Sequence, residues 1–226
     1  PGLPSRATAS VRPYYVGINN ALSKFDQKTR QALLTALNRD DINEAVYGPY
    51  AFTINAPVSN VSWAYSEEGL NKYAYNLEEA AKLLEEAGWT KNSSGKLERD
   101  GETLDITFTG MPDHPVLEVM LPVMKQDYES LGITFNIEYT DFPSLVDKVN
   151  NHKAEMWFMA WGLTPDPDPK QTYHSEGAQN TYQYSNPETD KLIDEALEET
   201  DQKKRKELYK KVWQALNEDV PCMWIY

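Results

Sequence analysis

Cysteine and histidine are scarce in this sequence of 226 residues. Cys222 is the only cysteine, so no internal disulfide can form, and its apolar neighbours predict a small buried side chain rather than a reactive thiol. The three histidines, His114, His152 and His174, lack the HExxH spacing that places two imidazoles on one helical face for zinc. We therefore expect no disulfide framework, no metal site and no cofactor.

Three glycine motifs that serve catalysis or phosphate binding are also missing. The chain has no GxSxG turn for a serine nucleophile, no GxGxxG turn for a dinucleotide and no Walker phosphate loop. These absences favour a protein that is not an enzyme. A hydrolase that uses the carboxylates of Asp166 and Asp168 stays open as an alternative, because carboxylate catalysis leaves little trace in a sequence.

Positive charge and long apolar runs are in short supply as well. Lysine and arginine number 22 against 35 aspartates and glutamates, which gives a formal net charge of -13. Nucleic acid and anionic membrane surfaces are therefore unsuitable partners, because both are bound through basic residues. The basic run 203–206 lies among acids and is expected to be a solvated surface. No apolar run can span a bilayer, and the start at 1–5 lacks a signal pattern, so we expect a mature or excised piece.

Aromatic residues and helix signals are plentiful. The 14 tyrosines and 6 tryptophans exceed what packing alone requires, and such rings often line concave ligand sites. Asp26 is a good N-cap for a helix over 27–37, and Asn76 with Glu79 gives a capping box for a helix that Gly88 ends. A short helix is expected around 42–46, and the unpatterned stretch 50–75 is predicted to be an ordered long loop.

Strands and helices alternate through the middle of the chain. The pattern predicts strands at 14–19, 104–108, 133–139 and 155–160, with helices at 114–131 and 142–151 between the last three. Such β-α-β spacing indicates a largely parallel sheet with helices on its faces. Two further helices, at 187–199 and 202–218, and a strand at 222–226 complete the expected elements. We expect residues 1–226 to form one α/β unit.

The segment 161–169, Trp-Gly-Leu-Thr-Pro-Asp-Pro-Asp-Pro, follows the strand at 155–160. The carboxyl ends of strands are where open α/β sheets bind ligands, and the three prolines restrict the backbone that carries Asp166 and Asp168. A rigid carboxylate beside the Trp161 indole would suit an ammonium group. On physical grounds alone, an alternative is at least as good: the acids form a turn or cap the next helix, and Trp161 belongs to the core.

Across almost its whole length the chain resembles the extracytoplasmic solute-binding proteins of family 5, the oligopeptide-, dipeptide- and nickel-binding proteins. The resemblance rests on the order and spacing of several fragments: Tyr-Tyr-Val-Gly-Ile-Asn-Asn at 14–20, the segments 25–33 and 38–40, Ala-Ala-Lys-Leu-Leu-Glu-Glu-Ala-Gly at 80–88, Leu-Gly-Ile at 131–133, the segment 161–169, Asn-Thr at 180–181 with 184–187, and 205–209.

This resemblance implies the C-terminal lobe of a periplasmic-binding-protein-like (type II) clamshell, with a mixed, mostly parallel sheet flanked by helices. The N-terminal lobe would be absent from this chain, and the ligand would lie in the cleft between the lobes. The implied function is the capture of oligopeptides for the permease subunits of an ABC importer. The implied location is extracytoplasmic, either in the periplasm or lipid-anchored to the outer face of the cell membrane.

The same resemblance implies site residues. In peptide-binding relatives the ligand main chain pairs with the segment after the strand, which here is Ala160, Trp161 and Gly162. The ligand's amino group would be received by Asp166 or, because the spacing from Trp161 is longer than in many relatives, by Asp168. Additional candidates for the cleft are Tyr15 and Asn19 on the first strand and, less favoured than a core role, Asn180 and Tyr182.

Other ligands and another class of protein remain open. Within the same fold, a nickel chelate, haem or an oligosaccharide could replace the peptide, and the aromatic content suits sugars. A purely structural or adhesive domain is the third class, after a binding protein and a carboxylate hydrolase.

Overall fold

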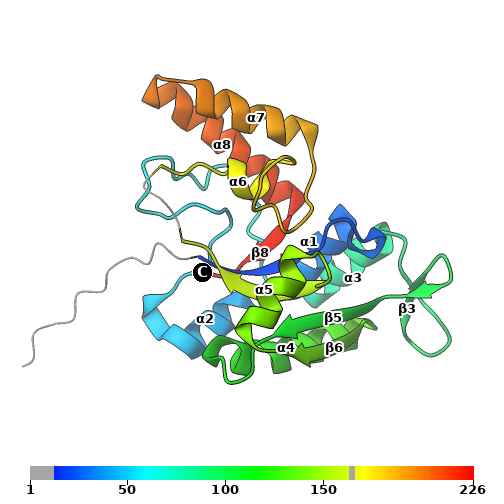
Figure 1. Ribbon diagram of the computed structural model, residues 1–226. Coiled ribbons are helices and arrows are strands. Elements are labelled where there is room, and N and C mark those ends of the chain that lie inside the picture. Colours follow the sequence, from blue (N-terminus) through cyan, green and yellow to red (C-terminus); the bar gives the residue numbers. More distant parts are fainter. Residues whose placement is uncertain (1–12, 163–165) are drawn as a thin grey trace, which may run out of the picture.

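The computed structural model describes residues 13–162 and 166–226. At its centre lies a five-stranded sheet in the order β6-β5-β7-β1-β8, with helices on both faces (Figure 1). The strands are β1 (Tyr14–Ile18), β5 (Asp105–Gly110), β6 (Thr134–Tyr139), β7 (Met156–Ala160) and β8 (Cys222–Trp224).

Four strands of this sheet run in one direction and β1 runs against them. β5 pairs in parallel with both β6 and β7, whereas β1 pairs antiparallel with β7 on one side and with β8 on the other. The prediction of a mixed, mostly parallel sheet is therefore confirmed. The antiparallel insertion of β1 was not predicted, because strand direction depends on neighbours that are far away in the sequence.

Seven of the eight α-helices in the described residues begin and end close to their predicted limits. The eight are α1 (Gln27–Thr35), α2 (Arg39–Tyr47), α3 (Leu77–Glu86), α4 (Pro115–Leu131), α5 (Phe142–Asn150), α6 (Lys170–Tyr173), α7 (Pro187–Glu198) and α8 (Gln202–Asp219), with short 3-10 turns at Ser23–Phe25 and Gly48–Tyr50. Asp26 caps α1 by accepting from the amide of Thr29, and Asn76 caps α3 as predicted. Within the described residues, none of these helices is both long and apolar enough to cross a bilayer. The four-residue α6 was missed, since it is too short to show a helical period.

The sheet separates two hydrophobic cores. One core packs α1, α3 and α4 against alternate strand residues such as Val16 and Phe158. The other packs α5, α7 and α8 against the intervening residues, including Tyr15 and Trp157. Because successive strand residues point to opposite faces, β1, β7 and β8 contribute to both cores. The buried hydrophobic residues of β5 and β6 belong to the first core.

A small second sheet was not predicted. It consists of β2 (Thr90–Lys91), β3 (Leu97–Arg99) and β4 (Glu102–Thr103). Asp100 and Gly101 connect β3 to β4 with positive φ angles of 56° and 84°. An Asp-Gly pair is the sequence signal for such a hairpin turn, but strands of two or three residues are too short to show alternation.

The long loop over 51–75 is ordered and contains neither helix nor strand, as predicted. The buried guanidinium of Arg39 anchors its first part by donating to the carbonyl oxygens of Ile54 and Trp224, each at 2.9 Å. A second anchor comes from α8, where Trp213 donates through its indole nitrogen to the carbonyl of Ala64 at 3.1 Å. These bonds fix the loop beside the end of β8.

Candidate binding site

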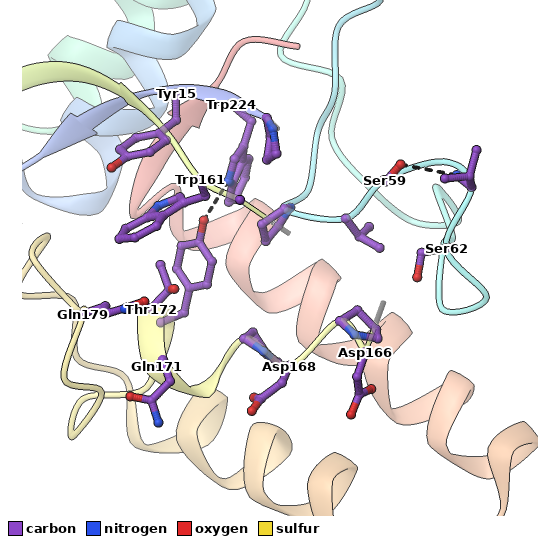
Figure 2. Close-up of a pocket in the computed structure, with 18 of the residues that line it drawn as sticks. Tyr15, Ser59, Ser62, Trp161, Asp166, Asp168, Gln171, Thr172, Gln179 and Trp224 are labelled. Atoms are coloured by element: carbon purple, nitrogen blue, oxygen red, sulfur yellow. Dashed lines mark hydrogen bonds between the residues drawn. The ribbon is translucent and has the colours of Figure 1, made fainter. Parts of the chain in front are cut away.

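A cavity of about 780 Å³ opens where β7 ends, β1 begins and β8 ends. Its floor carries Tyr15, Trp161 and Trp224, one wall comes from loop residues 57–63, and the opposite wall comes from residues 166–173 (Figure 2). The position matches the predicted one, at the carboxyl end of a strand in an α/β sheet. Apart from a few hydroxyl, amide and carboxylate groups, the lining is aromatic and aliphatic.

The floor is a set of rings in fixed contact. The rings of Tyr15 and Trp161 stack with centroids 5.8 Å apart and planes 9° apart. Behind them, Tyr182 is fully buried, meets Tyr15 edge-on and stacks on Trp157. The indole N–H of Trp161 donates to the Tyr182 hydroxyl at 2.7 Å, so this donor already has a partner within the protein. Trp161 therefore presents an oriented ring rather than a donor.

The backbone that follows β7 has one paired side. β7 pairs with β1 through Ala160, and the amide of Trp161 then donates to the carbonyl of Pro13 at 3.2 Å. Pairing with β5 reaches only Trp157. Backbone groups alternate between the two sides of an extended strand, so the amide and carbonyl groups of Ala160 and Gly162 point away from β1. They point to the side on which β5 lies, but β5 ends at Gly110 and its pairing with β7 does not reach them.

Asp166 is held by an arginine on α8. One of its carboxylate oxygens lies 3.1 Å from Nη2 of Arg205, whose Nε also donates to the carbonyl of Ala196 at 2.9 Å. The side chain of Arg205 is 20% exposed. The expectation that the basic run 203–206 is merely a solvated surface is therefore wrong for Arg205, because tertiary contacts fold its guanidinium inward.

Asp168 is exposed and turns the chain into α6. One of its carboxylate oxygens accepts a hydrogen bond from the amide of Lys170 at 2.7 Å. This bond forms a turn, as in the alternative interpretation in which the acids of this segment serve the backbone rather than a ligand. Figure 2 shows the carboxylates of Asp166 and Asp168 on the same side of their segment, away from Trp161. The expected arrangement of a carboxylate beside the indole is not observed. Residues 163–165 of the segment lie outside the described residues.

The remaining predicted residues divide into two groups. Tyr15, Trp161, Gly162, Asp166 and Asp168 all line the cavity, and Ala160 directly precedes it. Asn19 does not line it, because it lies at the other end of β1, is 4% exposed and bonds to the carbonyl of His152 and the side chain of Gln183. Burial raises the pKa of the Tyr15 hydroxyl well above its usual range, so Tyr15 is neutral.

Several lining residues escaped the sequence analysis. Trp63 and Pro57 come from the long loop, whose length was the available signal. Trp224 comes from the predicted strand at 222–226, and Tyr173 comes from a segment for which no element was predicted. Trp224 donates to the Tyr173 hydroxyl at 3.1 Å. Asn180, an early candidate for a wall, bonds to backbone groups of its own turn instead.

The sequence and the fold of this chain were compared with those of known proteins. The sequence model of a family described as "Bacterial extracellular solute-binding proteins, family 5 Middle" matches residues 1–183. The oligopeptide-binding protein AppA of Bacillus subtilis is 31% identical over 220 residues, which cover 94% of this chain. The solved structure of AppA in complex with a nonapeptide matches 97% of the chain with a TM-score of 0.92 and 30% identity, and the match covers 45% of that structure.

Two other relatives are named for different ligands, one for oligopeptides and one for heme. The periplasmic oligopeptide-binding protein OppA of Salmonella typhimurium is 28% identical over 94% of this chain. The heme-binding protein A of Haemophilus influenzae is 26% identical over 93% of it. The chain spans only 40%, 39% and 38% of the lengths of AppA, OppA and the heme-binding protein.

Proposed function

Since this chain belongs to family 5 of the bacterial extracellular solute-binding proteins, we propose that it supplies one wall of a solute-binding cleft. The solute is a short peptide, which is captured outside the cytoplasm and handed to the permease subunits of an ABC importer. The protein performs no chemistry on the ligand. The names of AppA and OppA support a peptide ligand.

The observation that carries this proposal is the backbone at Ala160 and Gly162. These residues extend β7 beyond the end of β5, and their amide and carbonyl groups point away from β1. An extended peptide that adds a strand there gains main-chain hydrogen bonds whatever its side chains are. The cavity beside this edge then accepts ligand side chains.

The other lobe and the amino-terminal contact complete the proposal. An N-terminal lobe in the rest of the protein closes over the ligand, because the chain spans only about two fifths of the relatives' lengths. We assign the ligand's amino group to Asp168 rather than Asp166, because Asp166 already pairs with Arg205. The mature protein is either periplasmic or lipid-anchored at the outer face of the membrane.

The first test is direct recovery of the ligand. Full-length protein is purified without denaturant, its ligand is released with acid, and the released material is identified by mass spectrometry. Intact peptides of mixed sequence support the proposal. Recovery of haem, a nickel chelate or a sugar would contradict a peptide ligand, and the half-buried ring of Trp161 also offers a surface to such molecules. Peptide fragments that accumulate with time would indicate an enzyme.

A backbone variant tests the added strand. Replacing Ala160 by proline removes an N–H that does not face β1, so the fold should persist while peptide affinity falls about tenfold. Ala160→Gly is the matched control, since it changes the same position but retains the N–H that proline removes. Calorimetry on full-length protein measures affinity, and circular dichroism confirms folding. Equal affinity of a folded Ala160→Pro variant would refute the backbone contact.

A further inference from the structure

Arg205 makes more contacts than any role as a surface charge requires. From the first turns of α8 it donates to the carbonyl of Ala196, to the hydroxyl of Tyr209 at 3.0 Å and to Asp166 at 3.1 Å. Its guanidinium carbon also lies 5.6 Å from the centroid of the Trp63 ring. A guanidinium suits such a position because it forms hydrogen bonds in its plane and stacks through its faces.

The two outer partners of Arg205 belong to opposite walls of the cavity. Trp63 belongs to the loop wall and Asp166 to the wall that follows β7, and both line the cavity. Tyr209 supports the same arrangement, since its ring meets Trp63 edge-on at 5.7 Å. One side chain therefore contacts both walls from behind.

We infer that Arg205 is a positioning residue that joins the two walls of the cavity and thereby sets which ligand side chains fit between them. The bond to Asp166 has a second consequence, because it commits that carboxylate to the protein rather than to a ligand. The side-chain selectivity in this inference rests on the proposed peptide function, whereas the joining of the walls does not.

The width of the cavity determines selectivity because its lining is mostly apolar. Pro57, Val58, Trp63, Trp161 and Trp224 line a space of about 780 Å³, which is large enough to take an aromatic side chain of the ligand. An apolar pocket discriminates between side chains by how well its walls contact them. If the walls separate, the contacts with an aromatic side chain weaken more than those with a small one.

Arg99 offers a matched control for a substitution at Arg205. It also pairs with an aspartate, Asp26, donates to backbone carbonyls and lies over a tryptophan ring, that of Trp89 at 4.2 Å. Its side chain is 20% exposed, the same fraction as that of Arg205. Arg99 supports β3 and α1, away from the cavity.

The ligand experiment compares Arg205→Met with Arg99→Met in full-length protein. Each variant and the wild type is incubated with an equimolar library of random pentapeptides, and the captured peptides are sequenced by mass spectrometry. We expect wild type and Arg99→Met to enrich aromatic over small side chains at one peptide position. In Arg205→Met this enrichment ratio should be at least threefold lower. An unchanged preference in Arg205→Met, or an equal loss in both variants, overturns the selectivity.

Hydrogen exchange tests the joining of the walls without any ligand. In Arg205→Met the amides of 57–64 and of 166–173 should exchange at least threefold faster, while Arg99→Met should leave both segments unchanged. If neither wall, or only one, exchanges faster in Arg205→Met, the inference is wrong. If wild type captures no peptide but both walls respond, the proposed peptide function fails and the positioning role of Arg205 stands.

Discussion

The indole nitrogen of Trp161 donates a 2.7 Å hydrogen bond to the hydroxyl of Tyr182, a side chain with no exposed surface. This bond and the stacking on Tyr15 fix the orientation of the Trp161 ring at the floor of the cavity. The two bonded residues come from different segments, the end of β7 and the turn before α7. The floor therefore depends on a buried residue that no ligand reaches.

Tyr182→Phe should loosen this floor while retaining the stacked ring. We expect the free energy of unfolding to fall by about 1 kcal/mol, because one hydrogen bond is lost, and ligand affinity to fall several-fold. Urea unfolding and calorimetry measure the two effects. Tyr50→Phe, on a side chain that is 76% exposed, is the control and should change neither quantity. Unaltered affinity in Tyr182→Phe would show that the orientation of Trp161 is unimportant.

Arg39→Met should release the long loop. Burial lowers the pKa of the Arg39 guanidinium to about 10, so it is charged at neutral pH, and it donates to three backbone carbonyls and to the side chain of Asn55. Without these donors, buried acceptors lose their partners, which should cost about 3 kcal/mol of unfolding free energy. Chemical denaturation measures this cost, and faster amide exchange over 51–64 would locate it. Lys91→Met, at an exposed lysine on β2, should have no such effect.

Gly17→Ala should be strongly destabilising. A Cβ at this position would lie 2.2 Å from the indole carbon Cε2 of Trp157, a buried ring directly opposite on β7. Overpacking of this kind costs about 3 kcal/mol, because the ring cannot move without disturbing the core. Gly162→Ala, where no atom lies within 4 Å, should change the free energy of unfolding by less than about 0.5 kcal/mol. Similar melting curves for the two variants would contradict the close approach.

Cys222 should be unreactive in the folded protein. It is fully buried, and burial raises the pKa of its thiol to about 12. An exposed thiol in the unfolded chain has a pKa of about 8.5, so the unfolded state loses its proton first. The contribution of this thiol to stability is complete below that pH and is lost as the pH rises toward the folded value.

Labelling with a thiol-specific reagent at pH 8 tests this expectation. Mass spectrometry of the peptide that contains Cys222 should show slow labelling of native full-length protein and complete labelling in denaturant. Rapid labelling under native conditions would mean that the thiol is accessible, contrary to its position among buried aromatic rings.

Local sequence determines the elements of this protein. Asp26 and Asn76 cap their helices, Gly132 ends α4 in a left-handed conformation, and strands 105–110, 134–139 and 156–160 appear where alternation predicts them. These features depend on residues within a few positions of each other, so they can be recognised from the sequence alone. The placement of Trp161 just after β7 is determined in the same way.

Tertiary structure decides what surrounds that segment. The antiparallel course of β1, the loop wall with Trp63, and the pairing of Asp166 with Arg205, 39 residues away, all depend on contacts between distant parts of the chain. The sequence shows two acids between prolines, but which acid is neutralised depends on where α8 packs. Hydrophobic burial fixes the position of α8, and that packing is a property of the whole fold rather than of any local pattern.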